Sequence, residues 1–442
     1  MPAWGATAQR PTADSLALRV DGYVKPYLDF AAFSGAVLIA RHGTILLERA
    51  YGMANYGLGV PNRPETRFHI ASVSKTFTAA AILLLMERGK LSVNDPIAKF
   101  IPDYPRGSEI TIHHLLVHAS GIPDVNDTPG YDSLARLPHT TASLVALFRD
   151  RPLEFPPGAR YSYSNSNYNL LALIIERVSG MSYGAFLREN IFRPAGMTST
   201  AHDSSAATIV PDLASGYVPA GATGLANAPY IDWTTKTGNG SVYSTVGDLF
   251  RWDRALSGET VLRRQSTELM FTPHLGGAGY GWLVGRRLNR RVYRMSGRTP
   301  GFSSEIARYP DDDLVVVVLS NNYAATATTI ATDLAAMVFG EPVVPLGARS
   351  PFSIARTTLD RYAGRYRGGE DFLIPNVTLS LEDRDGTLFM AWSSGAVEEL
   401  VPQSDSTFLD RKFWSMVRFV GPPPGDLIYH SGGKDYTARR TP

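Results

Sequence analysis

One stretch constrains this chain more than any other: ASVSKTFTAAAILLLME, residues Ala71–Glu87. Its second half, Ala79–Met86, is an unbroken apolar run, and a helix that is apolar on every side lies inside a core. The same helix opens on Ser72 and carries Lys75 three residues later. A buried, unpaired ammonium group is costly, so this lysine requires either a partner or a chemical role.

Ser72 and Lys75 are neighbours on one helix face, because residues three apart lie side by side. A serine hydroxyl is a weak nucleophile that needs an adjacent base, and a lysine provides one when burial lowers its pKa. Backbone N–H groups at a helix N-terminus suit a developing oxyanion. The alternative is an N-cap serine with a surface lysine, but the buried run Ala79–Met86 argues against a surface helix.

A second polar cluster occurs in PPGARYSYSNSNYNLLALIIE. The turn at Pro157-Gly158 is followed by Tyr163 and Asn165, and then by another apolar helix. From a short loop these two side chains can point into one cleft. Tyr163 would relay a proton, and Asn165 would bind a substrate amide or hold Lys75. The alternative is a tyrosine-rich polar loop without a chemical role.

Strand-like segments flank a helical middle. The sequence GAVLIARHGTILLERAYGMAN predicts a hairpin that turns at His42-Gly43. The segments RRVYRMSG, GFSSEIARYP and DLVVVVLSNN predict a meander with a turn at 310–313, followed by a closing helix. We therefore expect an α+β domain over residues 15–343, whose sheet combines early and late strands.

The end of the chain differs from the rest. The stretch EPVVPLGARSP is typical of a linker, and short alternating segments follow it, with turns at Asp385-Gly386 and Pro424-Gly425. Similar turns separate strands in meanders and barrels. We expect a small all-β domain over residues 351–442.

Several segments together resemble the serine β-lactamase and penicillin-binding protein family. They include FSGAVLIARHG, FHIASVSKTFTA, ITIHHLLVHASGIPD, PPGARYSYSNSNYNLL, GNGSVYSTVGDL and TPGFSSEIARYP. The closer resemblance is to the class C-like branch, with its D,D-peptidases, D-aminopeptidases and related esterases. It covers roughly residues 15–340 and implies an antiparallel sheet with a helical insertion. The C-terminal segment resembles a lipocalin-like appendage.

The resemblance implies a role for each polar residue. Ser72 would be the acylated nucleophile, Lys75 and Tyr163 would share the base role, and Asn165 would bind substrate. The backbone N–H groups of Ser72 and Arg298 would form the oxyanion hole. No cofactor is implied.

The family's third motif is Lys-Thr-Gly, His-x-Gly or similar, on a strand. A literal Lys236-Thr237-Gly238 is present, but it precedes a glycine-rich turn and a helix. Met295-Ser296-Gly297 lies between two predicted strands, so we expect these three residues to line the site and bind substrate. Lys236 is then a chance match on a loop.

Met295 has a consequence for specificity. A cationic or imidazole group at this position helps to hold the carboxylate of penicillins and peptide C-termini, whereas a methionine has no donor. Arg298 or Arg294 would have to compensate, but strand alternation puts Arg294 on the opposite face from Met295. The sequence thus favours esters over β-lactams.

Other kinds of site have weak support. His114 and His118 have metal-ligand spacing, but a zincin also needs a glutamate where Leu115 stands, so we expect no metal. The chain has no cysteine, which excludes thiolate sites. No Gly-rich phosphate loop and no Gly-x-Ser-x-Gly elbow occurs. The net charge of +2 gives no reason to expect a nucleic-acid partner.

The N-terminal residues suggest where in the cell the protein is found. No apolar run approaches the roughly 18 residues of a membrane span. Ala6-Thr7-Ala8 before Gln9 is typical of the end of an export signal, which predicts a periplasmic or secreted bacterial protein. The alternative is an N-terminus without a targeting role.

The first hypothesis is a serine hydrolase that forms an acyl-enzyme with small-molecule esters. Peptides with D-residues are the second substrate class, and β-lactams the third. A hypothesis of another class is a non-catalytic binding module, against which the complete set of Ser72, Lys75, Tyr163 and Asn165 argues. An interaction protein that works through its β domain is a further alternative. The sequence does not predict the oligomeric state.

Overall fold

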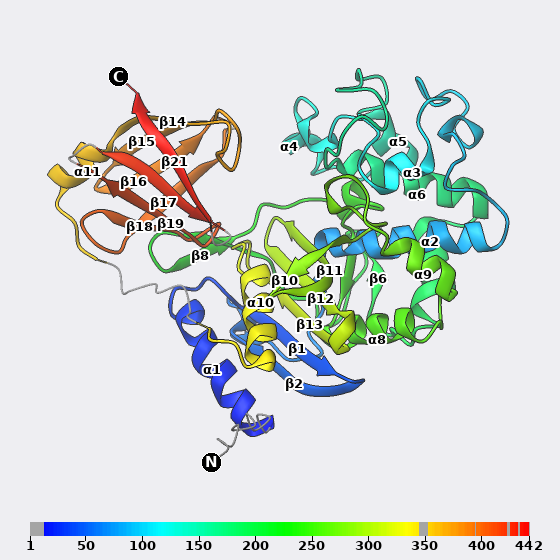
Figure 1. The fold of residues 1–442 in the computed structure, drawn as a ribbon, viewed down its shortest axis with the longest axis horizontal. Helices are drawn as coiled ribbons and strands as arrows, with labels where there is room; N and C mark the ends of the chain where they lie inside the picture. Colours follow the sequence, from blue (N-terminus) through cyan, green and yellow to red (C-terminus); the bar gives the residue numbers. More distant parts are fainter. Residues whose placement is uncertain (1–12, 344–351, 394, 422–424, 432–433, 442) are drawn as a thin grey trace, which may run out of the picture.

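The computed structural model describes residues 13–343, 352–393, 395–421, 425–431 and 434–441. Its larger part is built on a six-stranded antiparallel sheet with strand order β10-β11-β12-β13-β1-β2 (Figure 1). The strands are β1 (Gly35–Arg41), β2 (Thr44–Tyr51), β10 (Leu283–Arg287), β11 (Arg290–Thr299), β12 (Phe302–Tyr309) and β13 (Leu314–Ser320).

Early and late strands pair at the centre of this sheet. The register between β1 and β13 runs from Gly35 opposite Ser320 to Arg41 opposite Leu314. The β1–β2 hairpin turns at His42 and Gly43, both with positive φ. The predicted hairpin, the meander and the mixing of early with late strands are all confirmed.

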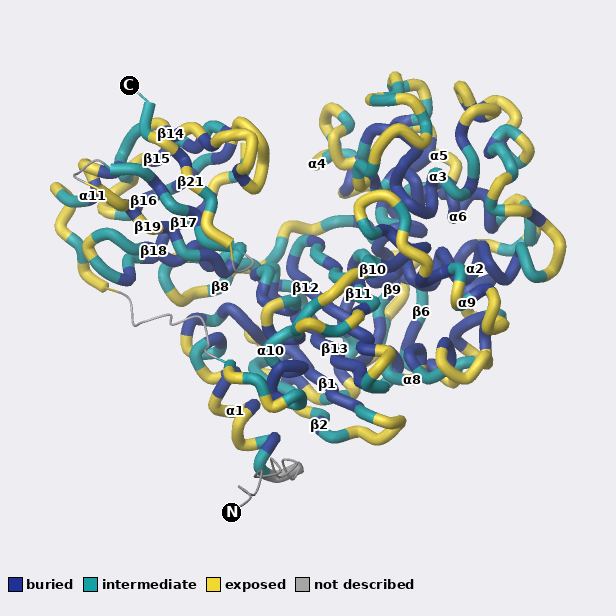
Figure 2. The backbone as a smooth tube through the Cα atoms, viewed as in Figure 1, coloured by how far each residue is buried: buried dark blue, intermediate teal, exposed yellow. Residues whose placement is uncertain are grey.

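Helices cover both faces of the sheet. One face packs against α1 (Ala13–Asp29) and α10 (Ala327–Phe339), and the other against α2 (Ser74–Glu87) and α8 (Val246–Ser257). Side chains of β1 alternate between the two cores, so nearly the whole strand is buried (Figure 2). This explains why β1 reads as a continuous apolar run.

The helical insertion lies beside α2. Its helices are α3 (Ile112–Leu116), α4 (Tyr131–Leu134), α5 (Thr141–Ala146), α6 (Asn165–Ser179) and α7 (Tyr183–Leu187). The later helix α9 (Arg264–Met270) also contacts α2. Short helical turns are η1 (Ala71–Val73), η2 (Ile97–Lys99), η3 (Val125–Asp127), η4 (Arg188–Phe192), η5 (Trp233–Lys236), η6 (Leu275–Gly277) and η7 (Pro310–Asp312). The minor strands are β3 (Met53–Asn55), β4 (Val60–Pro61), β5 (Phe68–His69), β6 (Ala201–His202), β7 (Tyr217–Ala220), β8 (Gly224–Asn227) and β9 (Val242–Ser244).

The ends of the two core helices follow their sequence signals. After α2, Gly89 has φ +66°, and the N–H groups of Gly89 and Lys90 donate to the carbonyls of Met86 and Leu85. These two hydrogen bonds form a Schellman motif, in which a glycine commonly occupies the position of positive φ. At the start of α8, the Thr245 side chain accepts from the N–H of Asp248. Thr245 is therefore the N-cap of α8.

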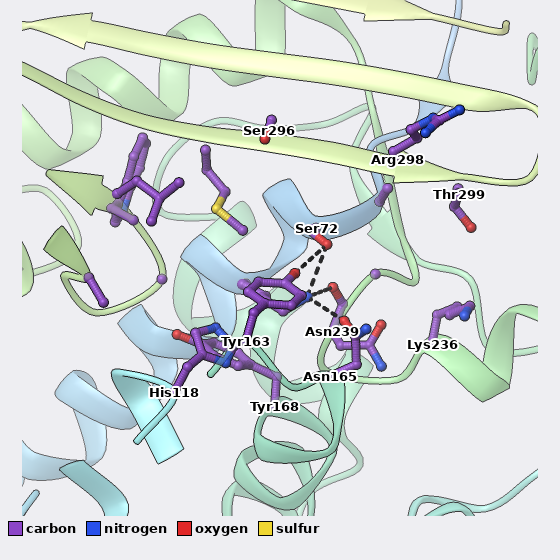
Figure 3. Close-up of a pocket in the computed structure, with 18 of the residues that line it drawn as sticks. Ser72, His118, Tyr163, Asn165, Tyr168, Lys236, Asn239, Ser296, Arg298 and Thr299 are labelled. Carbon is purple, nitrogen blue, oxygen red and sulfur yellow. Dashed lines mark hydrogen bonds between the residues drawn. The ribbon is translucent and has the colours of Figure 1, made fainter. Parts of the chain in front are cut away.

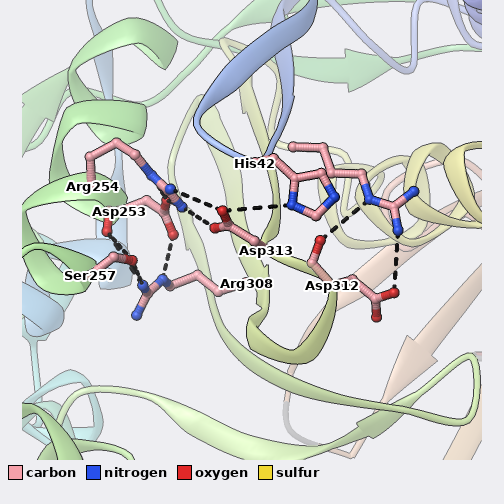
Figure 4. Close-up of polar contacts among 8 residues, drawn as sticks. His42, Asp253, Arg254, Ser257, Arg308, Asp312 and Asp313 are labelled. Carbon is pink, nitrogen blue, oxygen red and sulfur yellow. Dashed lines mark hydrogen bonds and ion pairs between the residues drawn. The ribbon is translucent and has the colours of Figure 1, made fainter.

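An ion-pair cluster fastens α8 to the sheet at the β1–β2 turn (Figure 4). The guanidinium of Arg308 donates to the Asp253 carboxylate and to Ser257 Oγ. Arg254 donates to Asp313, which follows the η7 turn. Because Asp253 and Arg308 are both buried, their pairing is what makes burying them tolerable.

The C-terminal part is a closed, eight-stranded antiparallel barrel in which each strand pairs with the next and β14 pairs with β21. The elements are α11 (Arg356–Tyr362), β14 (Gly364–Gly368), β15 (Thr378–Arg384), β16 (Thr387–Trp392), β17 (Val397–Pro402), β18 (Thr407–Asp410), β19 (Ser415–Val420), β20 (Asp426–Ser431) and β21 (Lys434–Thr441). Asp385 and Gly386 form the β15–β16 turn. The predicted all-β domain is confirmed as a barrel.

The β18–β19 turn joins the barrel to the larger part of the molecule. Trp414 stacks on Tyr27 of α1, with ring centroids 4.8 Å apart. The Arg411 guanidinium donates to the carbonyl of Phe30 at 2.7 Å and to that of Gly224 at 3.0 Å. Trp414 thus belongs to the same buried core as α1 and α10.

Three sequence predictions fall on residues that are not described. The Ala6-Thr7-Ala8 pattern lies outside the described residues, as do Pro424 and most of the expected linker at 341–351. Within the described ranges, no single helix is long and apolar enough to cross a membrane. Only α6 together with the α7–η4 segment meets that length and composition, as a pair bent by 76°.

Candidate active site

A cleft of about 380 Å³ lies where α2, α6 and β11 meet the loops of the helical insertion (Figure 3). Its walls bring together residues that are far apart in sequence. The predicted site residues that line it are Ser72, Lys75, Tyr163, Asn165, Met295, Ser296 and Arg298. Lys236, Asn239, Thr299 and Trp282 line the same cleft.

Ser72 lies in the η1 turn just before α2, not within the α-helix itself. Neither η1 nor α2 has a side-chain cap, so the Ser72 hydroxyl is not used as an N-cap. Ala71 precedes it with φ +46°, a strained conformation for a residue with a Cβ. This turn exposes Ser72 Oγ to the cleft, and the alternative reading as a simple helix cap is excluded.

The turn with Ser72 packs directly against β11. β10 pairs with β11 only as far as Arg294, so the rest of that strand has a free edge. A Cβ placed on Gly297 would come within 2.8 Å of the Ser72 backbone nitrogen and would also strike the Ile70 carbonyl. Only a glycine permits this approach. Gly297 therefore lies directly against the turn that carries Ser72.

Lys75 is completely buried, and its Nζ has three oxygen partners. They are Asn165 Oδ1 at 2.9 Å, the Asn239 carbonyl at 2.8 Å and Ser72 Oγ at 3.0 Å. Burial lowers the pKa of Lys75 well below its usual range; the Asp124 carboxylate opposes this and the Lys236 ammonium adds to it. A neutral amine has two N–H donors and one lone pair. The two carbonyl oxygens can only accept, so they take both donors and direct the lone pair at Ser72.

Asp124 fixes the orientation of Asn165. Its Oδ2 accepts from both the backbone N–H and Nδ2 of Asn165, each at 2.9 Å. Because a carboxylate accepts from the amide nitrogen, the amide oxygen has to face the other way, toward Lys75. Sequence reasoning missed Asp124, since one acidic residue in a loop carries no distinctive signal.

Tyr163 reaches Ser72 from the loop before α6. Its hydroxyl lies 2.8 Å from Ser72 Oγ, and its ring stacks on His118 with centroids 4.4 Å apart. The residue as a whole is 39% exposed, but its hydroxyl end is turned inward, and burial raises the pKa of the phenol above its usual range. The raised pKa favours the neutral phenol of Tyr163, which can donate its proton and accept a hydrogen bond.

The two histidines considered as metal ligands have other tasks. His114 Nδ1 accepts from Thr111 N–H in a capping box, whereas His118 Nδ1 accepts from Ser164 N–H. Burial lowers the pKa of His118 to about 3. Among the described residues, no group of three or more His, Cys, Asp or Glu is placed to hold a metal.

The arginines near the third motif point away from the cleft. Arg294 lies on the opposite face of β11 from Met295, beside the buried Glu305 at 3.8 Å. The Arg298 guanidinium donates to the carbonyls of Tyr323 and Lys412 and stacks on the Tyr323 ring. Neither side chain therefore supplies the cation that Met295 lacks.

Lys236, interpreted from the sequence as a chance match on a loop, does line the cleft. As expected, Lys236-Thr237-Gly238 is not on a strand: it ends the η5 turn. However, the loop turns back at Gly238, which has φ +83°, and brings Lys236 into the cleft. The Asn239 carbonyl that holds Lys75 belongs to the same loop. A main-chain carbonyl leaves no side-chain signal, so the sequence could not reveal this contact.

Known proteins share this fold and these motifs. The profile of the beta-lactamase family matches residues 20–337. Penicillin-binding protein 4* from Bacillus subtilis is 30% identical over 441 residues, which cover 92% of this chain and 95% of that protein. The chain therefore belongs to the beta-lactamase family, a family of serine hydrolases that act through an acyl-enzyme.

Solved structures extend the likeness to both parts of the molecule. The octameric penicillin-binding protein homologue from Pyrococcus abyssi superposes with a TM-score of 0.68 at 23% identity, covering 96% of this chain and 100% of that one. D-amino acid amidase from Ochrobactrum anthropi, complexed with D-phenylalanine, gives a TM-score of 0.60 at 23% identity, covering 69% of this chain and 92% of that one. At these identities the likeness concerns the fold.

Proposed function

We propose that this protein is an esterase that forms an acyl-enzyme on Ser72. The observation that carries the proposal is the set of three oxygen partners around Lys75 Nζ. Two of them are carbonyl oxygens, which take the two N–H donors of the neutral amine, so its lone pair points at Ser72 Oγ. A base held in this way is able to take the serine proton as the nucleophile attacks.

Acylation then proceeds with balanced proton transfers. Ser72 Oγ attacks the ester carbonyl carbon while its proton passes to Lys75 Nζ. The negative charge on the carbonyl oxygen would face the backbone N–H groups of Ser72 and Arg298, the oxyanion hole that the family resemblance implies. The carbon–oxygen bond breaks, Tyr163 passes a proton to the leaving alkoxide, and the proton held by Lys75 then replaces it on Tyr163. Tyr163 suits this step because its hydroxyl contacts Ser72 Oγ at 2.8 Å.

Deacylation uses the same groups in reverse. A water molecule attacks the acyl carbon and gives up a proton to the Lys75–Tyr163 pair. Ser72 Oγ leaves and regains its proton, and the carboxylic acid is released. Asn165 keeps Lys75 in place, supported by Asp124.

Ester preference is supported by the β11 wall of the cleft. Met295 offers no donor, and the side chains of Arg294 and Arg298 are engaged elsewhere. A charged hydrogen bond contributes roughly 1.5–3 kcal/mol, so its absence on β11 costs about 10- to 100-fold against substrates that need an anchor there. Esters also have better leaving groups than peptide amides.

Amide hydrolysis at D-residues is the second candidate. It is supported by the likeness in fold to D-amino acid amidase from Ochrobactrum anthropi. Its chemistry would use the same Ser72, Lys75 and Tyr163, with a protonated amine as the leaving group.

The test compares kcat/KM for p-nitrophenyl butyrate, a chromogenic cephalosporin and a D-amino-acid anilide. We expect the ester to be turned over fastest. A tenfold or greater advantage of the cephalosporin or the anilide would overturn the ester preference while leaving the acyl-enzyme mechanism intact. Failure of all three substrates to react would overturn the mechanism as well.

A further inference from the structure

Lys236 carries a charge in the cleft that no carboxylate neutralises. Its Nζ donates to Asn126 Oδ1 at 3.1 Å and to the Tyr131 hydroxyl at 2.8 Å, and both acceptors are neutral. Across the described part of the chain, Lys236 forms no ion pair. A lysine has three donors, so at least one is available to a ligand.

Two other donors that line the same cleft lack partners among the described residues. Thr299 is 6% exposed and Asn239 is 3% exposed, yet Thr299 Oγ1 and Asn239 Nδ2 have no hydrogen-bond partner in the described structure. Both residues line the cleft. Buried polar atoms are rarely left unpaired, because the loss of hydration is not offset. Such atoms at the wall of a cleft indicate that a ligand completes them.

These donors gather on one side of the nucleophile. Figure 3 shows Lys236 and Thr299 on the same side of Ser72, with His118 on the other side. Asn239 lies on the Lys236 loop, where its N–H donates to the Lys236 carbonyl at 3.0 Å. The loop therefore ties the free cation and one unpaired donor into a single structural unit.

We propose that Lys236, Thr299 and Asn239 form a carboxylate-binding subsite, so that the preferred substrates are esters that carry a carboxylate at this end of the cleft. The proposal rests on the esterase function proposed above. One cation flanked by two neutral donors matches a monoanion with two oxygens, each able to accept more than one hydrogen bond. The subsite combines the loop at η5, which carries Lys236 and Asn239, with Thr299 at the end of β11, four residues beyond Met295.

A matched pair of esters tests this subsite. p-Nitrophenyl hexanoate and p-nitrophenyl hydrogen adipate have acyl chains of equal length that end in a methyl group or a carboxylate. Spontaneous hydrolysis is subtracted for each. We expect kcat/KM to be at least about tenfold higher for the adipate, because its carboxylate accepts a charged hydrogen bond from Lys236 and neutral ones from Thr299 and Asn239.

Variants assign this preference to residues. Lys236→Met should lower the adipate-to-hexanoate ratio of kcat/KM about tenfold or more, and Thr299→Val a few-fold. The ratio cancels any effect of Lys236 on Lys75, because both esters use the same base. Lys99→Met is the matched control, since it removes a surface lysine that pairs with Asp95 at 2.8 Å; its ratio should equal that of the native protein.

The outcomes separate the two proposals. If both esters are hydrolysed and neither Lys236→Met nor Thr299→Val changes the ratio, the subsite is refuted and the esterase function stands. If neither ester is hydrolysed, the esterase function fails and the subsite falls with it. Should Lys236→Met fail to fold, Thr299→Val alone still decides, because it replaces one hydroxyl by a methyl group of similar size.

Discussion

The two walls of the cleft differ in how far their polar groups are satisfied. On the helical wall, Lys75 Nζ has three oxygen partners and Asn165 is held at both ends of its amide. On the β11 wall, Met295 has no donor at all and Thr299 Oγ1 is buried without a partner among the described residues, and Lys236 on the η5 loop has no counter-ion among them. The comparison teaches that the reacting groups are preorganised, whereas substrate recognition is completed by the ligand.

The largest effect should come from the helical wall. Ser72→Ala should lower kcat/KM by at least ~10³-fold and prevent labelling by an active-site phosphonate, because no other group attacks the carbonyl. Lys75→Ala should be nearly as damaging, since residues that act as one unit lose function together. Turnover assays and intact-protein mass spectrometry check this. Retained labelling of Ser72→Ala would show that another residue is the nucleophile.

A smaller but still large effect should come from a change at Gly297, where β11 packs against the turn that carries Ser72. Gly297→Val should lower kcat/KM about 100-fold, because its Cβ would push β11 away from the Ser72 backbone nitrogen. Gly285→Val on β10 is the control, since a Cβ there meets no atom within 4 Å. Circular dichroism of both variants shows whether they fold. Equal kcat/KM in the two would mean that close approach to β11 is not needed.

The smallest effect concerns charges that act across the cleft on Lys75. The base works only when neutral, so kcat/KM should rise with pH through the pKa of Lys75. Lys236→Met removes a positive charge that lowers this pKa, and should move the acidic limb to higher pH. Asp124→Asn removes a negative charge that raises it, and should move the limb to lower pH. Each shift should be at most about one unit.

The direction of these two shifts is the informative result. pH–rate profiles of kcat/KM with a neutral ester report the free enzyme. Asparagine at position 124 keeps an oxygen that accepts from Asn165, so the variant changes charge more than geometry. Movement of both limbs in the same direction would show that the limb reports a group other than Lys75.

Much of this could be predicted from the sequence, because local signals were strong. The apolar run of α2 and the hairpin turn at His42-Gly43 are both short-range features. Ser72 and Lys75 stand out because a charged residue is rare on a helix that is apolar on all sides. The strand context of Met295 was sufficient to place it on β11 in the cleft.

The failures concern contacts that depend on the tertiary path of a loop. Lys236 was set aside because its motif is not on a strand, a criterion that says nothing about where the loop returns. Asp124 and Asn239 act through an amide orientation and a main-chain carbonyl. Such contacts depend on where two loops meet, which no periodicity or spacing encodes.

The insertion of Trp414 between the barrel and α1 has a consequence for modularity. A domain that can be gained or lost freely meets its neighbour through a polar surface with few shared contacts. Here the β18–β19 turn contributes Trp414 to the core of the larger part and uses Arg411 to bind its main-chain carbonyls. Cutting the chain at the linker would uncover apolar surface on both pieces. Because the barrel and the larger part share this core, a destabilising change in either piece should weaken the other.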